Sequence, residues 1–248
     1  MISEIKIPAF FVNSIPKSGT NLLKQLLLGI PGLSHIPSKH EFYGGRLNQD
    51  ARLRLQNMKP KEFGAGHVMY SMEWANLFKE LNMKQIIISR DPRDIVVSYV
   101  QFIKRFPTLS PFFSFVVNNL KTDKERYLTI IRGLANMQRD INGLIRGFIG
   151  WFNNPNTLHI TFESLVSSVE SQNRTLNQIV SFLIKSDLNR KQIINKMKQN
   201  IIPAQSLTFR KGIIGDWKNE FDSETIDTFK KVAGQLLIEL GYEQDLHW

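Results

Sequence analysis

The feature of this sequence that most constrains its fold is a strand, a tight turn and a helix that follow one another from Phe10 to Leu27. The apolar residues at the start of this stretch predict a short strand. Paired leucines repeat at helical spacing over residues 22–27 and predict a helix with an apolar face. The stretch therefore predicts one strand–helix unit in which the helix packs on a sheet.

The turn between that strand and helix has the composition of an anion-binding loop. A helix that begins just after a strand points its unpaired N–H groups and the positive end of its dipole at the turn. Lys17 adds a full charge, and Ser18 and Thr20 add hydroxyl donors. Gly19 lets the backbone approach a ligand closely.

The order of residues in this turn differs from the common nucleotide-binding pattern GxxxxGK[ST]. That pattern places its lysine after the last glycine, whereas Lys17 precedes Gly19 and no earlier glycine lies in the loop. An ordinary turn with a surface lysine is the alternative that this stretch alone leaves open.

The strand–turn–helix order recurs later in the chain. Residues 85–89 form a β-branched apolar run that is typical of a parallel strand buried on both faces. A polar turn ends this run, and a helix is predicted from Ile95 to Phe106 with Asp94 as its N-cap. Residues 158–162 predict a further strand. The sequence therefore predicts an α/β fold in a single P-loop-like domain over residues 1–248, with a central parallel β-sheet flanked by helices.

Several other segments have helical periodicity. The predicted helices cover Trp74–Leu81, Tyr127–Phe152, Glu163–Ile184, Asn189–Lys198 and Ser223–Leu240. The aromatic, proline-interrupted segment Phe106–Asn119 fits a core helix and an apolar wall over a substrate equally well.

Composition narrows the class of ligand without naming it. The chain has 248 residues, of which 42% are hydrophobic and 22% charged, as in an ordinary soluble globular protein. A net charge of +10 favours acidic ligands, and the scattered cationic residues argue against a nucleic-acid-binding arm. The lack of cysteine excludes a catalytic thiol and a thiolate metal site. Without a signal peptide or a long apolar span, we expect a cytoplasmic protein with no membrane anchor.

Two groups of histidines are expected to have no catalytic role. His35, His40 and Glu41 lie in a loop punctuated by glycine and proline. A metal site could be drawn from them, but no third ligand at helical spacing follows them. We therefore expect solvated side chains or acceptor contacts there rather than a metal site. His159 lies in a predicted strand and is expected to be structural.

Three cationic clusters follow predicted strand ends or loop bends: Lys17, Arg90 with Ser98, and the segment 210–212. In an open α/β sheet such ends converge at one crevice, where ligands bind. Taken singly, each cluster is also typical of salt-bridged surface groups. If all three bind one ligand, that ligand has two separate anionic groups.

Three segments resemble, in the same order and spacing, the motifs of sulfotransferases that use 3′-phosphoadenosine 5′-phosphosulfate (PAPS). Pro16–Thr20 (PKSGT) is similar to the family's 5′-phosphosulfate loop, and Arg90–Tyr99 (RDPRDIVVSY) to its 3′-phosphate segment. Arg210–Lys218 (RKGIIGDWK) resembles the family's C-terminal signature, which closes over the nucleotide. The three motifs frame almost the whole chain, so the resemblance implies a PAPS-dependent sulfotransferase.

The resemblance also implies a role for each matching residue. Lys17 would contact the bridging oxygen and stabilise the departing phosphate, and His67 falls where the family has its general base. The residues matching the 5′-phosphosulfate loop are Ser18, Gly19, Thr20 and Asn21, and those matching the 3′-phosphate site are Arg90, Ser98, Arg210, Lys211 and Gly212. Sulfuryl transfer by these residues requires no metal.

Some positions depart from the family's pattern. Leu22 stands where many members have a tryptophan that stacks on adenine, and Ala65 replaces a lysine two positions before the histidine. Phe162 stands where the family often has tyrosine. The dimerisation motif of the animal cytosolic members is not evident after Trp217, so the sequence leaves the oligomeric state open.

Two alternative functions fit parts of the sequence. A P-loop kinase-like phosphotransferase fits the loop, although the lysine comes first and a metal-binding aspartate is missing after residues 86–88. A non-catalytic polyanion-binding module fits the charge alone. The acceptor stays open among small molecules, glycans and lipids.

Overall fold

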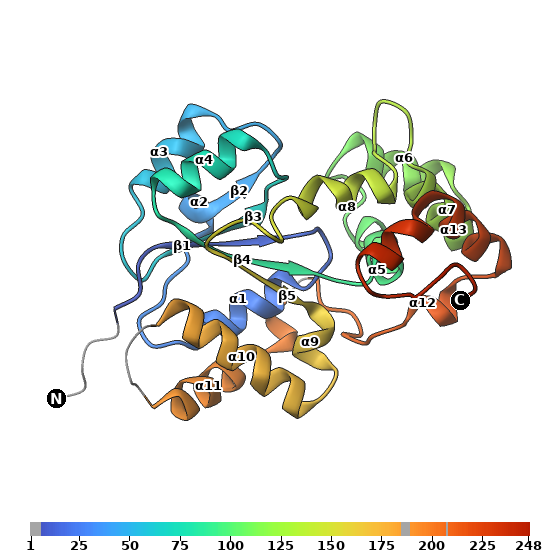
Figure 1. Ribbon diagram of the computed structural model, residues 1–248. Helices are drawn as coiled ribbons and strands as arrows, with labels where there is room; N and C mark the ends of the chain where they lie inside the picture. Colours follow the sequence, from blue (N-terminus) through green and yellow to red (C-terminus); the bar gives the residue numbers. More distant parts are fainter. Residues whose placement is uncertain (1–5, 185–188, 207) are drawn as a thin grey trace. The chain divides into compact units, whose positions relative to one another are not determined.

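The computed structural model describes residues 6–184, 189–206 and 208–248, and the chain divides into two compact units (Figure 1). Unit 1 comprises Met1–Ser89 and Phe148–Gly212, and unit 2 comprises Arg90–Gly147 and Ile213–Trp248. The single domain predicted over residues 1–248 stays a prediction.

A parallel sheet forms the centre of unit 1. Within the described residues it has five strands in the order β2-β3-β1-β4-β5. The strands are β1 Phe10–Ser14, β2 Glu41–Tyr43, β3 Phe63–His67, β4 Lys84–Ser89 and β5 Thr157–Thr161. Every neighbouring pair is parallel, which confirms the predicted central parallel sheet of an α/β fold.

The helices of unit 1 cover both faces of this sheet (Figure 1). They are α1 Thr20–Leu28, α2 Pro37–His40, α3 Gln49–Gln56, α4 Met72–Glu80, α9 Phe162–Val166, α10 Val169–Leu183, α11 Arg190–Gln199 and the short 3₁₀-helix η1 Pro203–Gln205. The predicted helix from Glu163 to Ile184 was wrong in its continuity, because Ser167 and Ser168 separate α9 from α10 and Ser168 caps the second helix.

Alternate side chains of the central strands pack into two apolar layers. On one face Val12, Ile86 and Ile88 join Leu23 of α1 and Ile179 of α10 in one buried cluster. On the other face the layer is aromatic: Phe11 packs on Phe42 of β2 and Phe78 of α4, and Phe78 stacks on Trp151. Each such side chain stabilises the fold by about 1.5–3 kcal/mol when it is fully buried.

Unit 2 is helical in its described residues. It contains α5 Pro92–Arg105, α6 Pro111–Asn119, α7 Asp123–Arg132, α12 Trp217–Glu220 and α13 Ser223–Glu239. The helix α8 Ile141–Ile149 begins in unit 2 and ends in unit 1. The continuous helix predicted over Tyr127–Phe152 was wrong, because α7 ends at Gly133, whose φ of 74° does not continue a helix.

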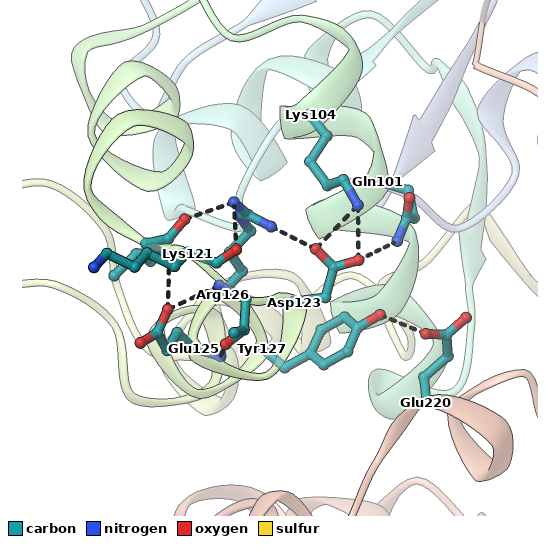
Figure 2. A network of polar contacts seen from close by, with 10 residues as sticks. Gln101, Lys104, Lys121, Asp123, Glu125, Arg126, Tyr127 and Glu220 are labelled. Carbon is teal, nitrogen blue, oxygen red and sulfur yellow. Dashed lines mark hydrogen bonds and ion pairs between the residues drawn. The ribbon is translucent and has the colours of Figure 1, made fainter.

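Polar contacts join three helices of unit 2 (Figure 2). Asp123 at the start of α7 accepts hydrogen bonds from Lys104 and Gln101 of α5 and from Arg126 of its own helix. Tyr127 donates to Glu220 of α12 at 2.8 Å. Because α7 carries both contacts, it ties α5 to α12.

Segment 106–119, whose role the sequence left open, is a packed helix of unit 2. Its helix α6 is capped by Ser110, which accepts from the Phe113 N–H, and it buries Phe112, Phe113 and Val116. The ring of Phe113 meets Phe102 of α5 at 5.9 Å. These contacts favour the core helix over the apolar wall.

Gly66 allows β2 and β3 to lie side by side. A Cβ atom at this position would lie 1.9 Å from the Phe42 carbonyl oxygen. We expect Gly66→Ala to lower the free energy of unfolding by at least about 2 kcal/mol, because the strand must shift to relieve the overlap. Gly45→Ala is the matched control, since a Cβ there meets nothing within 4 Å. Urea titration of both variants tests this, and equal stabilities would contradict the close approach.

Candidate functional site

The loop between β1 and α1 holds its backbone in two uncommon conformations. Lys17 has a φ of 71°, and Gly19, the N-cap of α1, has a φ of 101°. A side chain at position 19 would also meet the Phe162 ring at 2.8 Å. A lysine in the left-handed region costs on the order of 1 kcal/mol, and such strain clusters at functional sites. The predicted turn is therefore real and requires its glycine.

This loop contains polar groups that lack hydrogen-bond partners among the described residues. No side chain caps the first turn of α1, so its N–H groups face the loop without a capping oxygen. The Ser18 side chain is fully buried, and its Oγ has no hydrogen-bond partner among the described residues. A buried hydroxyl without a partner costs about 1–3 kcal/mol, which an incoming anionic oxygen would recover.

His67 ends β3 beside this loop. Its Nδ1 lies 2.9 Å from the Ser14 carbonyl oxygen. Because a carbonyl only accepts hydrogen bonds, Nδ1 carries the hydrogen and Nε2 keeps its lone pair in the neutral ring. Burial lowers the pKa of His67, and Lys17 lowers it further, while the bond to Ser14 acts in the opposite direction. The ring is thus held as a neutral base near pH 7.

Helix α1 also holds the segment that leads to the third cationic cluster. Asn21 donates to the Thr208 hydroxyl at 2.7 Å, and Gln25 donates to the Ile202 carbonyl at 2.9 Å. The exposed residues Arg210 and Lys211 follow two positions later, and Gly212 has a φ of 66°. Unit 1 therefore contains every predicted site residue except Arg90 and Ser98, and Asn21 contacts protein in this structure.

In unit 2, Asp94 organises the segment that follows the cluster. Its carboxylate accepts from the N–H groups of Gly215 at 2.9 Å and Trp217 at 3.1 Å. Arg90 donates to Asp94 at 3.2 Å and to the Ile213 carbonyl at 2.8 Å. The side chain of Asp94 is fully buried, so this contact is strong and specific.

The prediction that Asp94 caps α5 was wrong. The helix begins at Pro92, and its N-cap is Asp91, which accepts from the Arg93 N–H at 2.9 Å. Proline is favoured at the first helical position because its missing N–H has no partner there in any case. Asp94 and Ser98 then lie one helical turn apart on α5. The sequence pointed to residues 210–218 as a motif but did not indicate that Asp94 holds the segment 213–217.

Of the two alternatives expected for His35 and His40, solvated side chains and acceptor contacts, the structure contradicts the first, because both side chains are buried. His40 is buried, and its Nδ1 accepts from the Ile36 N–H at 3.0 Å. His35 stacks on Phe63 at 4.9 Å and donates from Nδ1 to the Phe63 carbonyl at 2.9 Å. Glu41, expected in a loop, begins β2. Residues that are their neighbours only in the folded chain bury the His35 and His40 side chains, and local composition does not reveal those neighbours.

His159 has structural contacts, as expected. Its ring stacks on Phe152 at 3.8 Å, and its Nε2 lies 2.7 Å from the Ser89 hydroxyl. Burial lowers the pKa of His159 to about 4. It therefore stays neutral at physiological pH and packs β5 against β4.

Neither metal-ligand clusters nor membrane spans are found in the part of the chain that the structure describes. Residues 6–184, 189–206 and 208–248 contain no group of three or more His, Cys, Asp or Glu side chains placed to hold a metal ion. In the same residues, no helix is long and apolar enough to cross a membrane.

Comparison with known proteins gives one consistent result. The family model described as "Sulfotransferase domain" matches residues 8–241. Flavonol 4′-sulfotransferase of Flaveria chlorifolia is 23% identical, over 93% of this chain and 79% of the relative. Amine sulfotransferase of Oryctolagus cuniculus is 22% identical, over 92% of this chain and 80% of the relative.

Solved structures agree on the fold. A mouse sulfotransferase complexed with PAP superposes with a TM-score of 0.66 at 20% identity, over 95% of this chain and 88% of that chain. Retinol dehydratase in complex with androsterone and the inactive cofactor PAP gives a TM-score of 0.65 at 17% identity, over 92% of this chain and 80% of that chain. Together with the family model, these likenesses support the predicted fold.

The Asp94 contacts predict that this side chain keeps the segment 213–217 ordered. We expect Asp94→Ala to speed hydrogen exchange of the Gly215 and Trp217 amides at least about 10-fold, because each loses its buried acceptor. Asp227→Ala, which removes an exposed carboxylate of α13, is the control and should leave both amides unchanged. Unaltered protection in Asp94→Ala would contradict the anchoring role.

Proposed function

Because the chain belongs to the sulfotransferase domain family, whose model matches residues 8–241, we propose that it transfers a sulfuryl group from PAPS to a hydroxyl or amine of a small acceptor. The single observation that carries the choice of an anionic donor is the loop at the start of α1. There a buried Ser18 hydroxyl without a hydrogen-bond partner among the described residues, a strained Lys17 and a helix start without a side-chain cap follow one another in the chain.

The two PAP-bound structures support the choice of PAPS among anionic donors. The mouse sulfotransferase and retinol dehydratase were solved in complex with PAP, the nucleotide left when PAPS loses its sulfuryl group. The loop motif PKSGT then takes the 5′ end of the donor, through Ser18, Gly19, Thr20 and Asn21. Asn21 would exchange its bond to Thr208 for a bond to the donor.

The 3′-phosphate is assigned to Arg90, Ser98 and the segment 210–212 on the strength of their sequence motifs. Asp94 supports this assignment, because it is close to Arg90 and holds the segment that follows residue 212. A guanidinium that is fixed by a buried carboxylate is pre-oriented for a phosphate.

The chemistry needs a base and a stabilised leaving group. PAPS supplies the activated sulfuryl group when it is bound. Nε2 of His67 accepts the proton of the acceptor hydroxyl or amine as the acceptor atom forms its bond to sulfur. Lys17 stabilises the negative charge that develops on the bridging oxygen as the sulfur–oxygen bond breaks. Neither step requires a metal ion.

This function is favoured over the two alternatives from the sequence. Family membership argues against a kinase-like phosphotransferase, and the neutral tautomer of His67 has no purpose in a passive polyanion-binding surface. The relatives named for a flavonol and an amine support a small-molecule acceptor, and Tyr43, whose ring centre lies 5.8 Å from that of His67, offers an aromatic surface to it.

Removing the base should separate transfer from nucleotide binding. We expect His67→Ala to lower kcat by about 10²–10⁴-fold while PAP binding in calorimetry stays unchanged, because His67 acts on the acceptor proton. His247→Ala, which removes an exposed histidine, is the control. Near-normal turnover in His67→Ala would show that another group is the base. Tight ATP binding without PAP binding would overturn the choice of donor.

The pH dependence follows from the direction of the His67 pKa. Burial, the largest effect, lowers this pKa, so the neutral base persists to lower pH than an exposed histidine allows. We expect kcat/KM to fall only below about pH 6.5, the ordinary histidine pKa. A pH–rate profile measures this, and an acid limb centred above that value would contradict the assignment.

A further inference from the structure

A buried hydroxyl, that of Ser14, lies between His67, the proposed base, and Thr20 at the end of the loop that joins β1 to α1, here called the donor loop. Ser14 ends β1, and its side chain is fully buried. Its Oγ lies 2.7 Å from Oγ1 of Thr20, the first residue of α1, and 3.0 Å from Nδ1 of His67. A third neighbour, the Gly66 carbonyl oxygen, is farther away at 3.4 Å. All four residues belong to unit 1.

The protons in this group can be placed by elimination. Nδ1 of His67 carries a hydrogen, because the Ser14 carbonyl oxygen 2.9 Å away can only accept. The Ser14 hydroxyl therefore accepts from the same N–H and has one proton to give. That proton goes either to Thr20 or to the Gly66 carbonyl, and the choice decides whether the Thr20 proton is available to a ligand.

An anion at the start of α1 selects one of these two arrangements. An anionic oxygen beside Thr20 accepts a hydrogen bond from the Thr20 hydroxyl. The Thr20 oxygen must then accept a hydrogen bond from the Ser14 hydroxyl. A hydroxyl that donates becomes a better acceptor, because hydrogen bonds in a chain polarise one another. The bond from Nδ1 of His67 to Ser14 is thereby strengthened, and electron density on Nε2 rises.

We propose that Ser14 is a positioning residue that makes His67 a stronger base when the donor loop is occupied. The inference rests on the proposed function, since it takes His67 as the base and the loop as the donor site. It explains why a serine hydroxyl is fully buried at the end of β1. Acceptor activation would then follow donor binding.

Charged groups around His67 act on it in both states. Lys17 of the loop and Lys24 of α1 lower its pKa, and Glu41 of β2 raises it. Lys24 is paired with Glu41 at 2.7 Å, and Tyr43 also donates to Glu41. A bound anion raises the His67 pKa through space as well. The contribution of Ser14 is therefore the part of the anion-induced rise in the His67 pKa that disappears when the Ser14 hydroxyl is removed.

The test measures the His67 pKa by ¹⁵N NMR, with and without saturating PAP, in the wild type and in Ser14→Ala. We expect PAP to raise the pKa in both proteins, and by about half a pH unit more in the wild type. Ser14→Thr keeps the hydroxyl and should restore the larger rise. Thr20→Val removes the other end of the chain and should reduce the rise as Ser14→Ala does.

Calorimetry and kinetics complete the test. Ser14→Ala should keep PAP binding within about 2-fold, lower kcat, and move the acid limb of the kcat profile to lower pH. Equal rises of the His67 pKa in wild type and Ser14→Ala would overturn the role of Ser14 and leave the proposed function standing. No PAP binding by the wild type would overturn both. If Ser14→Ala does not fold, Thr20→Val and Ser14→Thr still decide the outcome.

Discussion

The arrangement of unit 1 depends on how Asn13 continues the pairing of β1 with β3. Its side chain, fully buried, accepts from the Val68 N–H at 3.0 Å and donates to the Val68 carbonyl at 2.9 Å. The side chain thus acts as one more residue of the strand ladder just beyond His67. Trp151 donates to the same carbonyl at 2.9 Å, so the aromatic layer is tied to this point. Because Asn13 is fixed, Ser14 and His67 meet in one register.

The fixed register of β1 sets where the loop between β1 and α1 begins and which conformation its backbone takes. Ser14 is the last residue of β1, and three residues later Lys17 adopts a left-handed backbone conformation. Gly19 then turns the chain into α1 against the Phe162 ring. The strain is sustained because rigid elements lie on both sides of the loop. The Phe162 side chain therefore has a packing role beside Gly19.

Charge is distributed unevenly over the chain. Unit 1 contains nineteen lysine and arginine residues against nine aspartate and glutamate residues, whereas unit 2 contains thirteen of each. The whole net charge of +10 therefore belongs to the unit with the loop at the start of α1. An excess of positive charge raises the local concentration of an anionic donor and speeds its association. In unit 2, where the two signs of charge balance, cations such as Lys104 and Arg126 are paired with carboxylates (Figure 2).

The sequence by itself determined the parallel α/β architecture and the anion-binding turn, because apolar periodicity and a Lys-Ser-Gly-Thr loop act over a few neighbouring residues. Only the tertiary structure decided that His35 and His40 are buried, that Asp94 holds the segment 213–217, and that Ser14 lies between Thr20 and His67. These contacts join residues that are distant in the chain. They depend on which strands are neighbours and in what register, and no local pattern specifies that.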